Sequence, residues 1–182
     1  MSSGLGDTIC LRMKTTIFAA FAVLATFLGT ALVPAPALAD CTDPAQPKAN
    51  WRRCYFDGRD LSSAKLAGAM LRDATFQRAT LKDADLSDTD GYRAKFFSAT
   101  MPGVKLDGAR LIEADFTRAD LTGASLKEAD LRNAKLVSAV LQKADFTGAR
   151  LGGADLRHAD LSGATWIDGT TICAEKSVGQ CN

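Results

Sequence analysis

A leucine or phenylalanine returns every five residues along most of this chain, and this period fits neither common element of secondary structure. From Cys54 to Trp166 the period runs without a shift and gives 23 repeats, each named here by its central residue, from Phe56 to Trp166. Twenty of the 23 centres are Leu or Phe, and 19 of the 23 residues two positions before a centre are Ala. On a helix each step of five would turn a side chain by about 140°, and on a flat strand an odd period would put successive centres on opposite faces. All centres can point inward only if the chain turns once per repeat.

The spacing of the aromatic centres indicates how many repeats make one coil. Four of them, which we call the core ladder, lie 20 residues apart: Phe56, Phe76, Phe96 and Phe116. Four repeats per coil would stack these rings in one column. The opposite face would then stack Leu66, Leu86, Leu106, Leu126, Phe146 and Trp166. Each coil would hold one aromatic centre, which keeps the core volume constant from layer to layer.

The repeat also carries a recognisable consensus. Ala-Asp-Leu occurs at 84–86, 119–121, 129–131, 154–156 and 159–161. This A-(D/N)-L-x-x pattern resembles the pentapeptide-repeat family over residues 54–166. The resemblance implies an all-β fold, a right-handed quadrilateral parallel β-helix. Twenty-three repeats would make a solenoid of nearly six coils, about 28 Å long.

Four cysteines flank the predicted solenoid. Cys41 and Cys54 lie at its start, and Cys173 and Cys181 follow its end. Because bonded cysteines need Cα atoms within about 7 Å, only the pairs Cys41–Cys54 and Cys173–Cys181 avoid crossing the column. We therefore expect an N-terminal cap at 40–53 and a C-terminal cap at 167–182.

The two ends of the predicted column need closing. Trp51 and Trp166 are expected to cover the core there. The unpaired strand edges at open ends also allow a homodimer formed by end-to-end stacking.

The first 39 residues have the pattern of a secretory signal peptide. Lys14 precedes an apolar run at 17–33, and Ala37-Leu38-Ala39 offers a cleavage site that would leave Asp40 first. Met13 fits the start of such a signal better than Met1. Two other interpretations stay open: residues 15–39 are long enough to anchor the chain in a membrane if uncleaved, and Cys41 lies in a partial lipoprotein box. We predict a periplasmic or secreted protein, which agrees with an even number of cysteines.

Composition excludes several functions. The chain has 22 basic and 21 acidic residues, and 20 of each without residues 1–39. Nucleic-acid binding is not expected, because it requires surplus positive charge. The single histidine, His158, lies at an outward position with no nucleophile or metal ligand nearby. The many aspartates just before the centres are interpreted as hydrogen-bonding to turn backbone. We therefore predict no enzymatic activity, no cofactor and no metal.

Gly91 interrupts the pattern, since it replaces a core Leu while Thr89 replaces the preceding Ala. One interpretation is a local bulge repacked by Phe96 or Tyr92. The other is a protruding turn that presents Tyr92 and Phe97 to a partner.

Arginine is concentrated on two adjacent faces, the one that contains Leu71, Gly91 and Leu111 and the one over the core ladder. We call these faces the Arg-rich wall. They carry eight of the 11 arginines that follow residue 39: Arg72, Arg78, Arg93, Arg110, Arg118, Arg132, Arg150 and Arg157. Tyr92 and Phe97 lie among them, and arginine beside exposed aromatics is typical of binding surfaces. Acidic neighbours would cancel most of this charge, so a solvated mixed face is the alternative. A second, acidic face carries Asp85, Asp88, Asp107, Glu128, Asp145 and Asp168.

From these features we predict a non-catalytic exported solenoid that binds or scaffolds an unidentified protein in a bacterial periplasm or envelope. The residues expected to contact that partner are Tyr92, Arg93, Phe97, Arg72, Arg110, Arg118 and Arg132. No stable membrane insertion is expected after cleavage. The family resemblance also implies an alternative, a DNA-mimicking inhibitor or protector of gyrase, but zero net charge and export oppose it.

Overall fold

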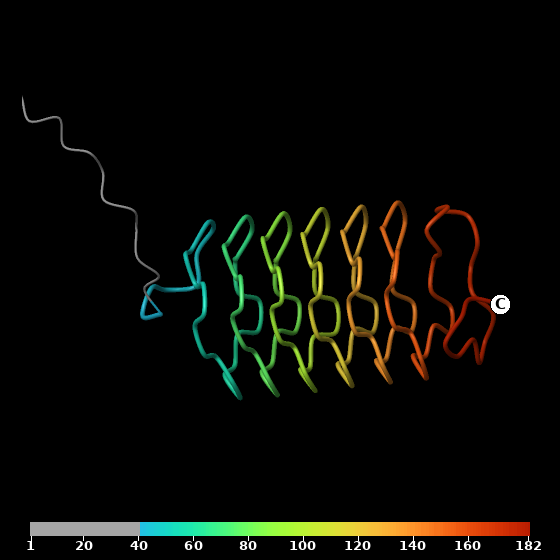
Figure 1. Ribbon diagram of the computed structural model, residues 1–182, viewed down its shortest axis with the longest axis horizontal. Helices are drawn as coiled ribbons and strands as arrows, with labels where there is room; N and C mark the ends of the chain where they lie inside the picture. The colour runs from blue at the N-terminus through green and yellow to red at the C-terminus, as the bar shows by residue number, and fades with distance from the viewer. Residues whose placement is uncertain (1–40) are drawn as a thin grey trace, which may run out of the picture. The chain divides into compact units, whose positions relative to one another are not determined.

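The computed structural model describes residues 41–182, so the expected signal peptide lies outside the described residues. This part of the chain has no helix, and its β-structure consists of single bridging residues separated by turns. Every fifth residue from Asn50 to Asp145 forms a parallel bridge with the residue 20 positions later. Four five-residue sides therefore complete one coil, as the spacing of the core ladder predicted, and Figure 1 shows the coils stacked in a column. Residues 41–182 also include no helix long and apolar enough to cross a membrane.

One repeat shows how backbone hydrogen bonds build each side. Leu106 donates its N–H to the C=O of Ser125 in the next coil at 2.7 Å, and Arg110 donates to Thr89 in the previous coil at 2.8 Å. The turn between them closes when Ala109 donates to the C=O of Leu106 at 3.1 Å. A positive φ at the third residue of this turn, +65° at Gly108, is the geometry of a type II turn. Each coil is thus held mainly by its two neighbours.

The core contains the centres and the small residues before them. Leu66, Leu86 and Leu126 are fully buried, and so are most of the alanines. In the core ladder, ring centroids are 5.3, 5.1 and 4.8 Å apart from Phe56 to Phe116, close to the spacing of neighbouring strands. Alanine suits its position because a larger side chain would fill space that the opposite wall occupies.

The regular coil begins one repeat earlier than predicted. Asn50 already bridges Met70, and Trp51 donates its N–H to the C=O of Met70 at 2.9 Å. Trp51 is therefore a repeat centre, buried to 2% exposure and packed 4.2 Å from the ring of Phe56. The predicted cap boundary at residue 53 is wrong, because the first coil already includes Asn50 and Trp51. Trp51 and Cys54, on either side of that boundary, are both buried in the core.

The C-terminal segment folds back over the last coil. Two antiparallel bridges, Thr165↔Ile172 and Asp160↔Val178, place residues 171–179 along two of its four sides. On the other two sides, those of Leu151 and Leu156, residues 41–182 supply no covering strand, and both leucines stay partly exposed. An end-to-end homodimer at this end stays a prediction.

Disulfides join Cys41 to Cys54 and Cys173 to Cys181, with Cα atoms 5.4 and 4.9 Å apart. These are the expected pairs. The first ties the incoming chain to the first coil, and the second closes the C-terminal segment on itself.

Gly91 does not interrupt the coil, so both the bulge and the protruding turn predicted there are wrong. The bridge Asp90↔Arg110 is regular, and Ala94 closes the turn by donating to the C=O of Gly91 at 3.0 Å. The space of the missing side chain is filled from the next coil, because Cδ2 of Leu111 lies 2.9 Å from where a Cβ on Gly91 would lie. Thr89 stays buried because its hydroxyl donates to the C=O of Leu86 at 2.8 Å.

Candidate partner-binding surface

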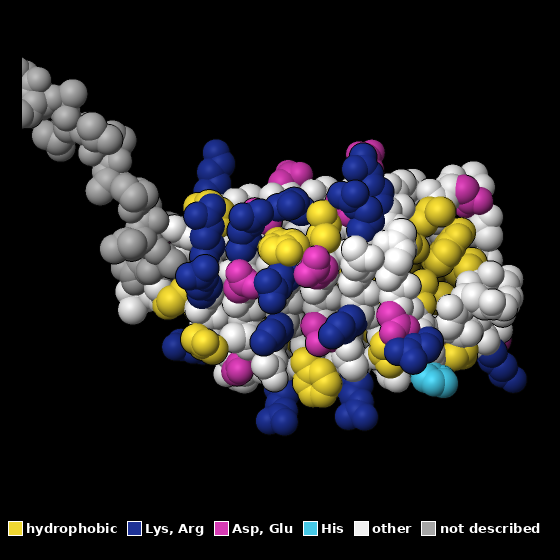
Figure 2. All heavy atoms as spheres, in the orientation of Figure 1, with side chains coloured by type: hydrophobic (Ala, Val, Ile, Leu, Met, Phe, Trp, Pro, Cys, Tyr) yellow, Lys and Arg dark blue, Asp and Glu magenta, His cyan; other side chains and the backbone are white. Residues whose placement is uncertain are grey.

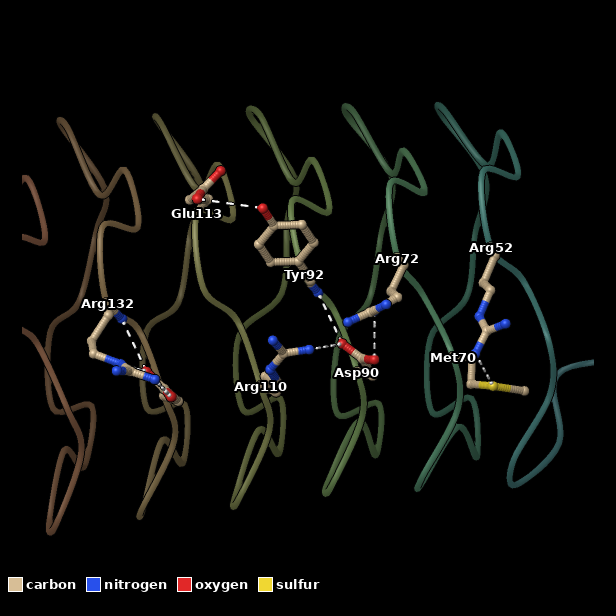
Figure 3. Close-up of polar contacts among 9 residues, drawn as sticks. Arg52, Met70, Arg72, Asp90, Tyr92, Arg110, Glu113 and Arg132 are labelled. Carbon is tan, nitrogen blue, oxygen red and sulfur yellow. Dashed lines mark hydrogen bonds and ion pairs between the residues drawn. The ribbon is translucent and has the colours of Figure 1, made fainter.

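Two columns of outward residues meet on the Arg-rich wall, and Figure 3 shows them together. Arg52, Arg72, Tyr92 and Arg132 occupy the same turn position in different coils, whereas Asp90 and Arg110 are bridging residues of the neighbouring ladder. Because the ladder fixes the backbone of each coil against the next, side chains 18 to 20 residues apart are brought within reach of one another.

Asp90 is the centre of this arrangement. Its carboxylate forms ion pairs with Nε of Arg72 at 2.7 Å and with Nη1 of Arg110 at 3.4 Å. The backbone N–H of Tyr92 also donates to Asp90, at 3.4 Å. The carboxylate thus joins three successive coils through two ion pairs.

The Tyr92 ring lies among three arginines. The Cζ atoms of Arg72, Arg93 and Arg110 lie 5.6, 5.9 and 5.6 Å from its centroid, within the range of cation–π contacts. The Tyr92 hydroxyl donates to Glu113 at 3.4 Å. The arginines therefore contact the face of the ring and Glu113 contacts its hydroxyl, although the side chain stays partly exposed.

The cluster is formally neutral. Arg93 lies 3.7 Å from Asp73 and 3.9 Å from Glu113, which are long, exposed ion pairs. We define the Tyr92 cluster as the tyrosine with its three arginines and three acids: Arg72, Asp73, Asp90, Tyr92, Arg93, Arg110 and Glu113. The cluster therefore presents a ring and guanidinium planes to solvent without net positive charge.

The other residues predicted on this surface lie outside the cluster. Phe97 belongs to the next side of the coil, is half-buried, and makes no ring contact with Tyr92. Arg118 is exposed and forms no ion pair among residues 41–182. Arg132 binds Asp130 through Nε and Nη2 at 2.8 and 2.7 Å, and this contact lowers the pKa of Asp130 and raises that of Arg132.

Most aspartates at bridging positions accept a hydrogen bond from the backbone of the following turn, as the sequence predicted. Asp60, Asp120 and Asp160 each accept from the N–H two residues later, at 2.9 to 3.0 Å. The Ser and Thr hydroxyls at those turns donate to the same carboxylates. These bonds favour the ionised form, so the pKa of Asp60 and of Asp160 is lowered.

On the acidic face, a turn aspartate instead accepts hydrogen bonds from the next coil. Asp107 accepts from the hydroxyl of Ser125 and from the N–H of Lys127, and Lys127 forms an ion pair with Asp145 at 3.2 Å. The part of the chain that the structure describes contains no group of three His, Cys, Asp or Glu side chains placed to hold a metal. His158 is exposed, as predicted.

Sequence reasoning missed one further feature, the repeat centred on Trp51. Counting back five residues from Phe56 would have found it, since Ala49-Asn50-Trp51 keeps the spacing with Trp in place of Leu.

Comparisons with known proteins agree with this geometry. The family model for pentapeptide repeats matches eight copies, at residues 48–78, 92–127 and 124–163. The chain therefore belongs to the pentapeptide-repeat family, whose members form right-handed quadrilateral β-helices. No protein with a curated description matches the chain.

Several solved structures are similar. HetL, a pentapeptide repeat protein involved in heterocyst differentiation regulation from the cyanobacterium Nostoc sp. strain PCC 7120, is 35% identical with a TM-score of 0.56. The match covers 70% of this chain and 60% of HetL, so this chain spans less than two thirds of that relative. Another Nostoc PCC 7120 pentapeptide repeat protein is 34% identical (TM-score 0.40, 53% and 83% covered). A trypsin-treated form of QnrB1, a plasmid-mediated fluoroquinolone resistance protein, is 26% identical (TM-score 0.41, 65% and 64% covered).

Proposed function

We propose that this protein is a non-catalytic, exported solenoid of six coils, counting the repeat centred on Trp51, that binds another protein in the bacterial periplasm or envelope. The observation that carries the proposal is the Tyr92 cluster. An aromatic ring lies among three guanidinium groups, and Asp90 holds two of them, those of Arg72 and Arg110, on a backbone fixed by the ladder of hydrogen bonds. Anchors that are already ordered lose little entropy on binding, and Tyr and Arg are the residues that most often dominate binding energy.

Two features support export. The structure contains two disulfides, which persist in oxidising compartments and are rare in the cytosol of most bacteria. The first 39 residues have the pattern of a signal peptide. Export is tested by N-terminal sequencing of the protein from the periplasmic fraction, where we expect Asp40 as the first residue. A lipidated Cys41 or an intact N-terminus would contradict cleavage.

The DNA-mimicking alternative receives no support from the surface. A mimic of DNA needs a predominantly negative wall, whereas residues 41–182 carry 20 basic and 19 acidic side chains and the acidic face itself includes Lys65, Lys105 and Lys127. The Tyr92 cluster itself is neutral.

The binding proposal is tested by capture from envelope extract with wild-type protein and with a Tyr92→Ala/Arg93→Ala variant. Both side chains lie outside the core, so the variant should fold normally. It should weaken capture of the partner by about 2 kcal/mol or more, roughly 30-fold.

A matched control lies on the acidic face. Asp88 and Glu128 are exposed and have the same backbone conformation as Arg93, with φ of +56° against +57°. Asp88→Lys/Glu128→Lys should fold normally, because Lys143 adopts the same positive φ at an equivalent turn. It should leave capture unchanged, because both residues lie on the acidic face and not in the Tyr92 cluster. If this control loses the partner and the Tyr92 variant retains it, the partner binds the acidic face and the proposal is wrong.

A further inference from the structure

Positive charge is concentrated at the N-terminal end of the column. Residues 41–82 contain eight basic and four acidic side chains, whereas residues 83–182 contain 12 basic and 15 acidic ones. The formal charge is therefore +4 in the first part and −3 in the second. Figure 2 shows Lys and Arg side chains grouped at the end of the column where the described chain begins.

Five of these cations surround the first coil. All are exposed, and none forms an ion pair with another residue of the described range: Lys48, Arg52, Arg53, Arg59 and Lys65. Arg52 contacts only the sulfur of Met70 through a hydrogen bond of 2.9 Å. In contrast, the arginines of the Tyr92 cluster are neutralised by acids.

Two of the three acids among residues 41–65, Asp57 and Asp60, are engaged elsewhere. Asp60 accepts from both the N–H and the hydroxyl of Ser62, and Asp57 accepts from the N–H of Gln77 at 2.9 Å and from the Thr75 hydroxyl. Each carboxylate faces its own turn or the second coil. Hydrogen bonds from Ser87 and, to a smaller extent, the charge of Lys65 lower the pKa of Asp85 in the second coil, and the other four cations keep their charge available to a partner beyond the first coil.

An exposed aromatic ring lies within this basic group. Tyr55 is 78% exposed, the most exposed large hydrophobic residue among residues 41–182. Arg59 occupies a position that holds alanine in most repeats, yet it is exposed, and no coil of the described range 41–182 precedes it. It lines a hollow of about 410 Å³ at the end of the column together with Trp51, Phe56, Leu61 and the acidic residue Asp43.

The same end receives the chain from its N-terminal segment. The Cys41–Cys54 disulfide fixes Cys41 against the first coil. In sequence, the uncharged apolar stretch at 15–39, which is long enough to span a bilayer, ends two residues before Cys41. Only Asp40 lies in sequence between that stretch and the Cys41–Cys54 disulfide, so a membrane that held the stretch would be within a few residues, in sequence, of the basic end.

We propose that the basic end of the column, formed by Lys48, Arg52, Arg53, Tyr55, Arg59 and Lys65, binds an anionic lipid surface. Lysine and arginine next to a membrane are attracted by acidic headgroups, and tyrosine prefers the headgroup region because its ring is amphipathic. The column then stands on the membrane with the Tyr92 cluster two coils, about 10 Å, above the first coil. This inference does not depend on the protein-binding function proposed above.

The test is vesicle flotation of the protein purified with both disulfides formed. Vesicles of phosphatidylcholine alone are compared with vesicles in which about one third of the lipid is phosphatidylglycerol. We expect binding to the anionic vesicles at about 0.05 M salt, at least tenfold weaker binding at about 0.5 M salt, and little binding to neutral vesicles. Failure to bind anionic vesicles at low salt overturns the proposal.

A matched pair of charge reversals locates the surface. Arg52→Glu/Arg53→Glu/Arg59→Glu should lower anionic-vesicle binding about 100-fold or more, since each reversal replaces attraction by repulsion. Glu is compatible with the backbone at residue 53, because Glu113 and Glu128 adopt the same positive φ. The control, Lys135→Glu/Lys143→Glu/Arg150→Glu, changes net charge equally at exposed residues without ion pairs and should keep most of the binding.

Equal losses in the two triple variants would show that net charge alone attracts the vesicles, and would overturn the proposed surface. Tyr55→Ser should weaken binding severalfold without changing the salt dependence. A DNA duplex that competes fully with anionic vesicles at equal charge would show a general polyanion site and would also contradict the proposal.

Discussion

Cδ2 of Leu111 lies 2.9 Å from the position that a Cβ on Gly91 would occupy, so the leucine of one coil fills the core of the coil before it. The Leu at position 111 has its ordinary role in its own repeat, because its N–H donates to Asp130 at 2.8 Å. The side chain that fits at position 91 therefore depends on the size of the side chain at position 111.

This coupling predicts that restoring the consensus at Gly91 will destabilise the protein. Gly91→Leu should cost about 1–3 kcal/mol through overpacking against Leu111, although the φ of Gly91 is not in the left-handed region. Leu111→Ala alone should cost about 2–5 kcal/mol because it leaves a cavity. Chemical denaturation of both variants and of the double variant measures the coupling. Additive costs in the double variant would show that Leu111 does not fill the Gly91 space.

The core ladder predicts a large loss at its middle. The Phe96 ring is fully buried and stacks on Phe76 at 5.1 Å and on Phe116 at 4.8 Å. Phe96→Ala should reduce the free energy of unfolding by about 3–5 kcal/mol. Phe96→Leu, which keeps most of the volume, should cost clearly less. A similar cost for the two variants, measured by urea denaturation, would argue against stacked aromatic packing.

The C-terminal disulfide is expected to stabilise mainly the last coil. It closes a loop with a sequence separation of eight, for which the unfolded-chain entropy model gives about 2–3 kcal/mol. Cys173→Ala/Cys181→Ala should speed hydrogen exchange at Leu161 and Trp166, whose amides donate to Ser177 and Thr171. Amides in the central coils should change much less, since each coil depends on its neighbours. Uniform acceleration along the whole column would show that the solenoid opens as one unit.

Acid should destabilise the fold through aspartates whose pKa is lowered. Hydrogen bonds from the hydroxyl and N–H of Thr171 and from the N–H of Thr170 lower the pKa of Asp168 to about 2, and similar bonds lower the pKa of Asp60, Asp85 and Asp160. Because each folded pKa lies below the unfolded value, the unfolded state takes up protons first as the pH falls. Stability from these groups is complete above about pH 4 and is lost between about pH 4 and pH 2.

Thermal melts across this range measure the loss. Asp168→Asn should make the melting temperature fall slightly less steeply toward pH 2 than in the wild-type protein. The control is Asp88→Asn, at an exposed turn, which should keep the wild-type pH dependence. Unchanged melting between pH 5 and pH 2 in the wild-type protein would contradict the assigned role of these carboxylates.

The sequence by itself determined the fold of this protein. The five-residue period, with Ala before each Leu or Phe, allows only a coil that turns once per repeat, and the 20-residue spacing of Phe56 and Phe76 predicted four sides. The cysteine pairs followed from the same geometry, because a bond between the two ends would have to cross the column. These predictions succeeded because each depends on a local rule that repeats along the chain.

The candidate site was decided only in three dimensions. Arg72, Asp90 and Arg110 are 18 to 20 residues apart in sequence, and only the register of the ladder makes Asp90 their shared partner. The same ladder forces Arg93 and Glu113 into the positive φ that turn preferences assign to Gly or Asn, since hydrogen bonds to both neighbouring coils outweigh that local cost. Gly91 shows the physical reason most plainly. A single sequence position predicts a cavity, but whether the cavity exists depends on a side chain from another coil, and Leu111 fills it.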